Sequence, residues 1–242
     1  MDKKEFYNAL SEDYDEMIDF ENALDRRKNL LAGFIKKHST ALDFGCGTGV
    51  DSIALTHSSL SVDAFDISEE MIVKGRTNAS NYNMSINFYS DFSLIESSQK
   101  KYDLIISLGN TLANLPQLEL KHKLYSFDKM LAKGGRMVFQ IINYVKVGNA
   151  DTFLIAEKET KFHKIKRFYE KLSDGIVFKI LVENKTSGKS KTLQTKIYPH
   201  TIEVFHEFFD KKNYDLNYWG SLNKDTYNPN LSNDLVICSD KI

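Results

Sequence analysis

The stretch that decides the fold reads Leu42-Asp43-Phe44-Gly45-Cys46-Gly47-Thr48-Gly49. An apolar run leads there into a loop with glycine at every second position, and a helical pattern begins directly afterwards at Val50. Glycines at such a place let the backbone approach a ligand closely at the carboxyl edge of a parallel sheet, where open α/β folds bind ligands. The segment therefore predicts a strand, a ligand-binding turn and a helix. A tight turn that binds nothing is the structural alternative.

A nicotinamide or flavin site is a second alternative for this loop. The fingerprint of those folds, Gly-x-Gly-x-x-Gly, would need a third glycine at position 50. That position is Val50, and an acid, Asp43, precedes the loop. The pattern therefore favours another class of nucleotide-binding protein.

Apolar runs and amphipathic stretches alternate on both sides of this loop. Ser68 followed by Glu69 and Glu70 predicts a helix start, because a hydroxyl caps free amides and acids suit the positive end of a helix. A further helix is expected to stop at Gly134-Gly135. The alternation predicts an α/β fold with a doubly wound parallel sheet and helices on both faces. The expected strands are 41–44, 62–65, 86–89, 104–108 and 137–142.

After Asn143 the alternation of strand and helix patterns ends. Residues 161–170, 176–183 and 192–198 read as strands without intervening helices, which predicts an antiparallel β insert after the fifth strand. Residues 202–209 read as a helix, and 214–219 and 235–238 as two closing strands. Residues 6–35 read as helical, and we expect this segment to pack across the ligand edge as a lid. The predicted organisation is a helical lid (1–38), a cofactor-binding core (39–145), an insert serving as substrate cap or dimer surface (146–199), and a closing helix and strands (200–242).

Composition excludes several functional classes. The 242 residues carry 32 Lys plus Arg against 33 Asp plus Glu, a formal charge of −1, so no global field draws the chain to nucleic acid or anionic membranes. Cys46 and Cys238 form no Cys-x-x-Cys pair, which argues against a disulfide framework and a thiolate zinc site. His200 and His206 fall on different helix faces, so no metal site is expected. We expect a cytoplasmic protein without a signal peptide or membrane span.

The glycine loop, extended to CGTGVDSI at residues 46–53, resembles the first motif of the class I S-adenosylmethionine-dependent methyltransferases, and in particular small-molecule N-methyltransferases of the glycine and sarcosine type. The stretch LIISLGNTLANL at residues 104–115 is similar to the fourth-strand motif of that group. The resemblance covers roughly residues 40–145. It implies a Rossmann-like sheet of seven strands, S-adenosyl-L-methionine as cofactor and S-adenosyl-L-homocysteine as product.

Two acids at strand ends are candidate cofactor ligands. Asp66 ends the second apolar run 19 positions after Gly47, where a carboxylate can accept both hydroxyls of a ribose. A solvated turn carboxylate is the alternative. Asp91 follows the third run, and the resemblance implies that it meets the adenine amino group while the amide of Phe92 meets a ring nitrogen. An ordinary loop acid is the alternative for Asp91.

Further cofactor residues are implied by position. Ile67 and Met71 would sandwich the adenine, although apolar residues there are also ordinary core. Tyr14 and Tyr7 are candidate lid residues, because an aromatic face stabilises a sulfonium cation; helical packing is their alternative. Arg26 and Arg27 do not align with the lid arginine that relatives carry. The remaining positions implied for the cofactor are Gly45, Cys46, Gly47, Leu108, Gly109 and Asn110, of which Asn110 either orients the amino-acid end or caps a turn.

The substrate side departs from the glycine-type enzymes. Their fifth strand ends in a His-Arg-Asn-Tyr run whose arginine grips the substrate carboxylate, whereas this chain reads Ile141-Ile142-Asn143-Tyr144. Asn143 and Tyr144 are the candidate substrate residues. Burying a carboxylate without a cation is costly, so glycine fits poorly unless the insert supplies Arg167 or a lysine. We expect a less charged or larger metabolite.

The catalytic residue is not assigned from the sequence. An unprotonated amine needs no general base, whereas an oxygen or carbon acceptor would benefit from Tyr144, Tyr7 or a histidine of the insert. The expected function is methyl transfer to a nitrogen or oxygen atom of a small molecule, with no nucleic-acid or membrane partner, by a monomer or homodimer. One alternative is an RNA or protein methyltransferase, with Lys185, Lys189 and Lys191 touching RNA, although a solvated turn explains those lysines. The other is a non-catalytic cofactor-binding module.

Overall fold

The computed structural model describes residues 1–35, 39–147, 151–172 and 175–242. Residue 38, where the lid was predicted to end, and residues 148–150 and 173–174 of the predicted insert lie outside the described residues.

Seven strands form the main sheet in the order β10-β11-β5-β4-β1-β2-β3. The strands from β1 to β5 are parallel, whereas β11 runs antiparallel to both β5 and β10. This order confirms the predicted doubly wound methyltransferase-type sheet. The bounds are β1 Thr40–Phe44, β2 Ser61–Phe65, β3 Asn87–Tyr89, β4 Tyr102–Ser107, β5 Leu131–Ile142, β10 Tyr214–Trp219 and β11 Asp234–Lys241.

Helices cover both faces of this sheet, because successive strand residues point to opposite sides. Ala41 packs in the cluster beneath α2 (Phe20–Ala32), α3 (Val50–His57) and α4 (Glu69–Asn81). Its neighbour Leu42 packs in the opposite cluster with α5 (Phe92–Ser97), α6 (Gln117–Met130) and α8 (Ile202–Asp210). Within the described residues, no helix combines the length and apolarity needed to cross a bilayer.

Two helix boundaries differ from the predictions. The segment predicted to be helical over 6–35 consists of two helices, α1 (Lys3–Ile18) and α2, which Asp19 separates with a left-handed φ of 60° and ψ of 66°. Helix α6 ends at Met130, because β5 begins at Leu131, before Gly134-Gly135. Two short elements, η1 (Thr111–Asn114) and α7 (Tyr144–Val147), follow β4 and β5.

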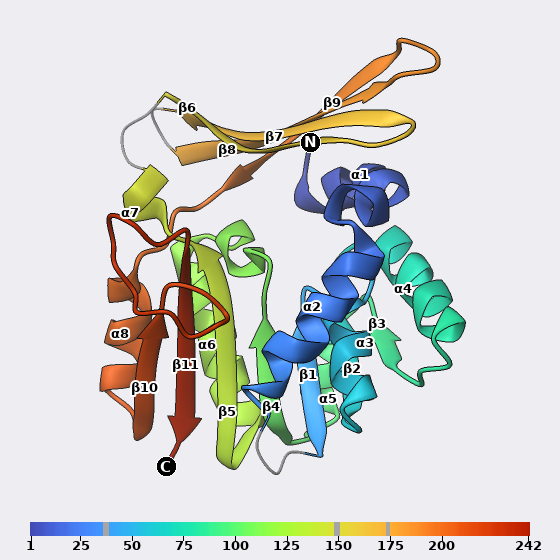
Figure 1. Ribbon diagram of the computed structural model, residues 1–242. Helices are drawn as coiled ribbons and strands as arrows, with labels where there is room; N and C mark the ends of the chain where they lie inside the picture. Colours follow the sequence, from blue (N-terminus) through green and yellow to red (C-terminus); the bar gives the residue numbers. More distant parts are fainter. Residues whose placement is uncertain (36–38, 148–150, 173–174) are drawn as a thin grey trace.

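The insert is an antiparallel sheet of β6 (Thr152–Glu159), β7 (His163–Leu172), β8 (Gly175–Asn184) and β9 (Ser190–Ile197) in the described residues. The sequence predicted three of these strands. Strand β6 was missed because it pairs only with β7 and carries the charged run Glu157-Lys158-Glu159, which is typical of a sheet edge. Figure 1 shows the insert lying across the carboxyl ends of β1, β4 and β5, with α1 beneath it.

Helix α1 is held between the insert and the core. Its buried side chains Phe6 and Leu10 pack with Ile165 and Ile180 of the insert and with Met71 of α4. Burial of these apolar side chains stabilises the arrangement by roughly 1.5–3 kcal/mol each. The helix therefore forms one wall of the space under the insert.

Candidate functional site

The glycine loop after β1 bends back toward β2. The amides of Gly45 and Cys46 both donate to the carbonyl of Phe65, at 2.7 and 2.9 Å. Gly45, Gly47 and Gly49 have φ values of 84°, 54° and 89°, a region that other residues rarely adopt. A Cβ on Gly45 would lie 2.2 Å from Cγ2 of Thr111, so only glycine fits there.

Asp66 lies directly against this loop. Its carboxylate accepts hydrogen bonds from the amides of Gly47 and Ser68, each at 2.9 Å. Burial raises the pKa of Asp66 to about 6, although the two amides act in the opposite direction. The predicted proximity of the glycine loop and this acid is thus present in the structure, while the role of Asp66 toward a ribose stays a prediction.

A cavity of about 680 Å³ lies between the loop, α1 and the insert. Its size is in the range of small-molecule sites. Ten of the predicted cofactor residues line it, namely Tyr14, Gly45, Cys46, Gly47, Asp66, Ile67, Met71, Phe92, Leu108 and Gly109. Met71 is fully buried, whereas Ile67 is 45% exposed. The exposed apolar side chain of Ile67 at the cavity has room to contact a ring.

Four predicted site residues do not line this cavity: Asp91, Asn110, Asn143 and Tyr144. The exposed Asp91 accepts a hydrogen bond from the amide of Ser93 at 2.9 Å and caps α5. Interactions with the side chain and the amide of Ser93 lower the pKa of Asp91. Asn143 is buried and donates to the carbonyls of Pro229 and Ser232. The position of Asn143 therefore gives no support to its expected role as a substrate residue.

Asn110 and Tyr144 belong to a hydrogen-bonded cluster behind the cavity wall. Nδ2 of Asn110 donates to the hydroxyls of Tyr144 and Tyr169, at 2.8 and 3.2 Å, and its Oδ1 accepts from the amide of Ile142 at 3.0 Å. Asn110 has a φ of 70°, which asparagine tolerates better than most residues. The cluster joins the end of β4, the end of β5 and the insert.

Two tyrosines of α1 face the cavity. A Cβ on Gly47 would lie 3.3 Å from the Tyr14 ring, so Tyr14 covers the glycine loop. The hydroxyl of Tyr7 accepts a hydrogen bond from Nδ2 of Asn114 at 3.0 Å. Burial raises the pKa of Tyr7 to about 12 and raises that of Tyr14 as well. Both phenols are therefore neutral at physiological pH.

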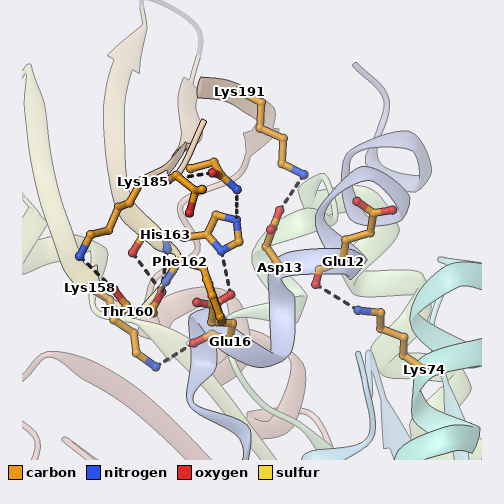
Figure 2. A network of polar contacts seen from close by, with 12 residues as sticks. Glu12, Asp13, Glu16, Lys74, Lys158, Thr160, Phe162, His163, Lys185 and Lys191 are labelled. Atoms are coloured by element: carbon orange, nitrogen blue, oxygen red, sulfur yellow. Dashed lines mark hydrogen bonds and ion pairs between the residues drawn. The ribbon is translucent and has the colours of Figure 1, made fainter. Parts of the chain in front are cut away.

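Polar contacts fasten α1 over the cavity (Figure 2). From the insert, Nζ of Lys191 lies 2.6 Å from the Asp13 carboxylate, and Nζ of Lys158 donates to the carbonyl of Glu16 at 2.7 Å. Nδ1 of His163 lies 2.8 Å from the Glu16 carboxylate. We call these three contacts the lid latch. They hold the C-terminal half of α1 to the insert.

A carboxylate pair lies behind the glycine loop. The buried Asp43 accepts a 2.6 Å hydrogen bond from the Ser52 hydroxyl, and burial together with the nearby Asp51 raises the pKa of Asp43. Asp51 lies 3.1 Å from Nε of Arg27 and lines the cavity. The ion pair between Arg27 and Asp51 links α2 to the first turn of α3.

Gln140 and Asp234 are among the polar residues that line the cavity and that sequence reasoning missed. Nε2 of Gln140 donates to Asp234 at 2.8 Å, and Oε1 of Gln140 accepts from the amide of Gly109 at 3.3 Å. The signal for Gln140 was a single polar residue inside an apolar strand. Within the described residues, no group of three His, Cys, Asp or Glu side chains is arranged to hold a metal ion.

Comparisons with known proteins agree with this geometry. A family model described as a methyltransferase domain matches residues 35–212. Human glycine N-methyltransferase is 32% identical over 135 residues, which are 48% of this chain and 46% of that protein. Ribosomal protein L11 methyltransferase of Campylobacter concisus is 34% identical over 125 residues, 51% of this chain and 43% of that protein. The chain thus spans about half the length of these curated relatives.

Among solved structures, the fold is similar to a crystal structure of an S-adenosylmethionine-dependent methyltransferase from Clostridium acetobutylicum. The TM-score is 0.76 at 14% sequence identity, and the match covers 97% of this chain and 98% of the other. At this identity the similarity concerns the fold, including the insert.

Proposed function

Since this chain belongs to the methyltransferase domain family, we propose that it transfers the methyl group of S-adenosyl-L-methionine to a nitrogen or oxygen atom of a small metabolite. The observation that carries the proposal is the single cavity that joins the glycine loop and Asp66 to Arg167 and Phe178 of the insert. A cavity continuous between these two ends provides for a cofactor and an acceptor together.

The residues at the glycine end fit an adenosyl amino acid. Asp66 offers a carboxylate for the ribose diol, and the crowded Gly45 leaves only backbone to meet a ligand. Ile67 and Phe92 offer apolar surface for the adenine. When bound, S-adenosyl-L-methionine supplies an electrophilic methyl group on a positively charged sulfur.

The chain's own contribution is orientation and exclusion of water. Holding an acceptor in line with a methyl group is worth roughly 7–11 kcal/mol of barrier. The neutral rings of Tyr7 and Tyr14 present faces suited to a sulfonium cation. A phenol with a pKa of about 12 is a poor base at neutral pH, which favours an amine acceptor over a hydroxyl.

The RNA alternative is weakened by ion pairs that the insert lysines form within the insert and with α1. Lys185 lies 2.6 Å from Glu159, and Lys191 lies 2.6 Å from Asp13. These carboxylates neutralise two of the three lysines that had been expected to meet RNA. A gel-shift titration at low salt distinguishes the functions: retarded RNA whose binding weakens with added salt would favour the alternative.

The reducing cytoplasm expected from the sequence remains our proposal for the setting of Cys46 and Cys238, whose side chains are both buried. The protein-substrate alternative, which the ribosomal relative's name raises, requires an acceptor side chain to reach beneath α1 and the insert. Transfer of labelled methyl to protein rather than to low-molecular-weight material would favour it.

Two measurements test the proposal. Calorimetric titration with S-adenosyl-L-homocysteine should show binding, with at least a tenfold loss in Asp66→Ala and none in Glu70→Ala, an exposed acid of α4. Methyl-labelled cofactor incubated with metabolite pools should then yield a labelled small product. A wild-type protein that ignores the cofactor contradicts the proposal. Binding without any labelled product supports the non-catalytic module.

A further inference from the structure

Arg167 occupies a position where the strand pattern calls for an apolar side chain. Along β7, the buried Ile165 and Tyr169 flank it two residues away on either side, so all three share the inward face of the insert. Its cross-strand neighbour on β8 is Ile180, which is fully buried. Arg167, at the centre of this apolar face, is partly buried and lines the cavity.

Arg167 also lacks an anionic partner among the residues that the structure describes. Across the described residues, no carboxylate or carbonyl lies within hydrogen-bond or ion-pair distance of its guanidinium. Burial lowers its pKa, and the nearest polar groups acting on it are the phenols of Tyr14 and Tyr169. A partly buried cation on an apolar face is costly without a counter-charge, unless a ligand supplies that charge.

The acids that line the same cavity are already engaged elsewhere. Asp51 pairs with Arg27, Asp66 accepts from two backbone amides, and Asp234 accepts from Gln140. Among the described residues that line the cavity, each carboxylate therefore already has another partner than Arg167.

We propose that Arg167 binds an anionic oxygen group of the methyl acceptor, a carboxylate or a phosphate, and thereby selects acidic metabolites. The inference rests on the proposed methyl transfer and adds the chemical class of the substrate. The planar guanidinium can donate two parallel hydrogen bonds to either group. The acceptor end is indicated because Arg167 belongs to the insert, whereas the glycine loop and Asp66 belong to the core.

The cofactor's own carboxylate is the competing source of negative charge. Two other arginines that line the cavity, Arg26 and Arg27, lie on α2, and Arg27 contacts the first turn of α3 directly after the glycine loop. Arg27 is thus tied to the helix that follows the glycine loop, whereas Arg167 lies on the insert. Measurement of cofactor affinity in the Arg167 variants separates the two sources.

The test uses full-length protein saturated with S-adenosyl-L-homocysteine. Benzoate, phenyl phosphate and the uncharged benzamide serve as probes in calorimetric titrations of the wild type, Arg167→Gln, Arg167→Lys and Lys166→Gln. Lys166, the control, lies on the opposite face of β7 and pairs with Glu157 at 3.3 Å. We expect at least one anion to bind tenfold or more tightly than benzamide. That preference should be lost in Arg167→Gln, partly kept in Arg167→Lys and unchanged in Lys166→Gln.

The outcomes separate this inference from the proposed function. Stronger binding of benzoate or of phenyl phosphate identifies which oxygen group is preferred, and both results support the proposal. Equal binding of anions and benzamide, or no anion binding, overturns it. A tenfold loss of cofactor affinity in Arg167→Gln also overturns it, because the arginine would then serve the cofactor. Failure of the wild type to bind the cofactor contradicts the proposed function instead.

Discussion

The backbone amide of Gly47 donates a 2.9 Å hydrogen bond to the carboxylate of Asp66, 19 residues later in the chain. This contact ties the turn after β1 to the end of β2. It also leaves the carboxylate on the cavity wall, where its ionisation state matters for any ligand that donates hydrogen bonds.

Cofactor affinity should depend on pH through Asp66. Burial raises its folded pKa from 3.8 to about 6, so the carboxylate is ionised above that pH and protonated below it. Affinity for S-adenosyl-L-homocysteine should therefore be flat from pH 7 to 8 and fall by up to tenfold per pH unit below about 6. Titrations from pH 5 to 8 check this, and Asp66→Asn should remove the dependence. An identical slope in that variant contradicts the assignment.

The same shift has a consequence for the unliganded protein. A raised carboxyl pKa favours the protonated folded state, so its contribution to stability is present below 3.8 and is lost as pH rises through about 6. At neutral pH the ionised, buried Asp66 therefore lowers the free energy of unfolding of the unliganded protein. Urea unfolding of the wild type and Asp66→Asn over this range measures that contribution.

Gly45→Ala should destabilise the fold by roughly 2–4 kcal/mol and abolish cofactor binding. The added methyl group would meet Thr111 at 2.2 Å, and the backbone has a φ of 84°. Gly109→Ala is the matched control, because Gly109 has a φ of 63° but open space around its Cβ direction. It should cost only about 1 kcal/mol. Equal losses in urea unfolding of the two variants would contradict the steric argument.

Loosening the lid latch should free α1 without unfolding the core. In Lys191→Ala the Asp13 carboxylate, whose side chain is 10% exposed, loses its cation, at a local cost of roughly 1–3 kcal/mol. Amide hydrogen exchange in α1 should accelerate while exchange in β1 and β4 stays unchanged. Lys189→Ala, at the exposed turn of the same hairpin, should leave both unchanged. Faster exchange throughout the sheet would show that α1 is part of the cooperative core.

Acid stability should depend on Asp63. Burial alone would raise its pKa, but hydrogen bonds from Lys100, Asn87 and Tyr102 outweigh it and lower the pKa. Its contribution to stability is therefore present above the unfolded pKa of 3.8 and is lost as pH falls through the lower folded value.

Urea unfolding at pH 2 to 7 checks this contribution. Asp63→Asn should be less stable than the wild type at pH 7, and the difference should shrink toward pH 2. Asp25→Asn, which removes a surface pair with Lys28, should show no such trend. A pH-independent difference for Asp63→Asn contradicts the assignment.

Local pattern was enough to predict the core sheet and the sheet edge at which the glycine loop and Asp66 meet. The alternation of Ala41 and Leu42 between two apolar clusters follows from the pleat of a strand covered on both faces. The proximity of Asp66 to the glycine loop followed from adjacent parallel strands, whose carboxyl ends meet at one edge. Both inferences need only the local sequence, the two-residue alternation of side chains along a strand and the common direction of neighbouring strands.

Other features depend on long-range contacts that no local pattern carries. The break at Asp19 places α1 under the insert, where Phe6 and Leu10 find partners more than 150 residues away. Asn143 was predicted to face a substrate, yet its amide instead satisfies loop carbonyls at Pro229 and Ser232. Asn143 is used in this way because buried carbonyls need hydrogen-bond donors, and which carbonyls are buried beside it depends on the folded chain.

The insert's strands pair only with each other and contribute no hydrogen bond to the seven-stranded sheet among the described residues. The chain departs after β5 and returns at α8, as Figure 1 shows. Substitutions in this module therefore leave the strand pairing of the main sheet unchanged and reach the glycine loop through α1 and the Asn110 cluster. Under the proposed function, exchange of this cap at its two junctions, after β5 and before α8, offers protein engineers a route to new acceptors.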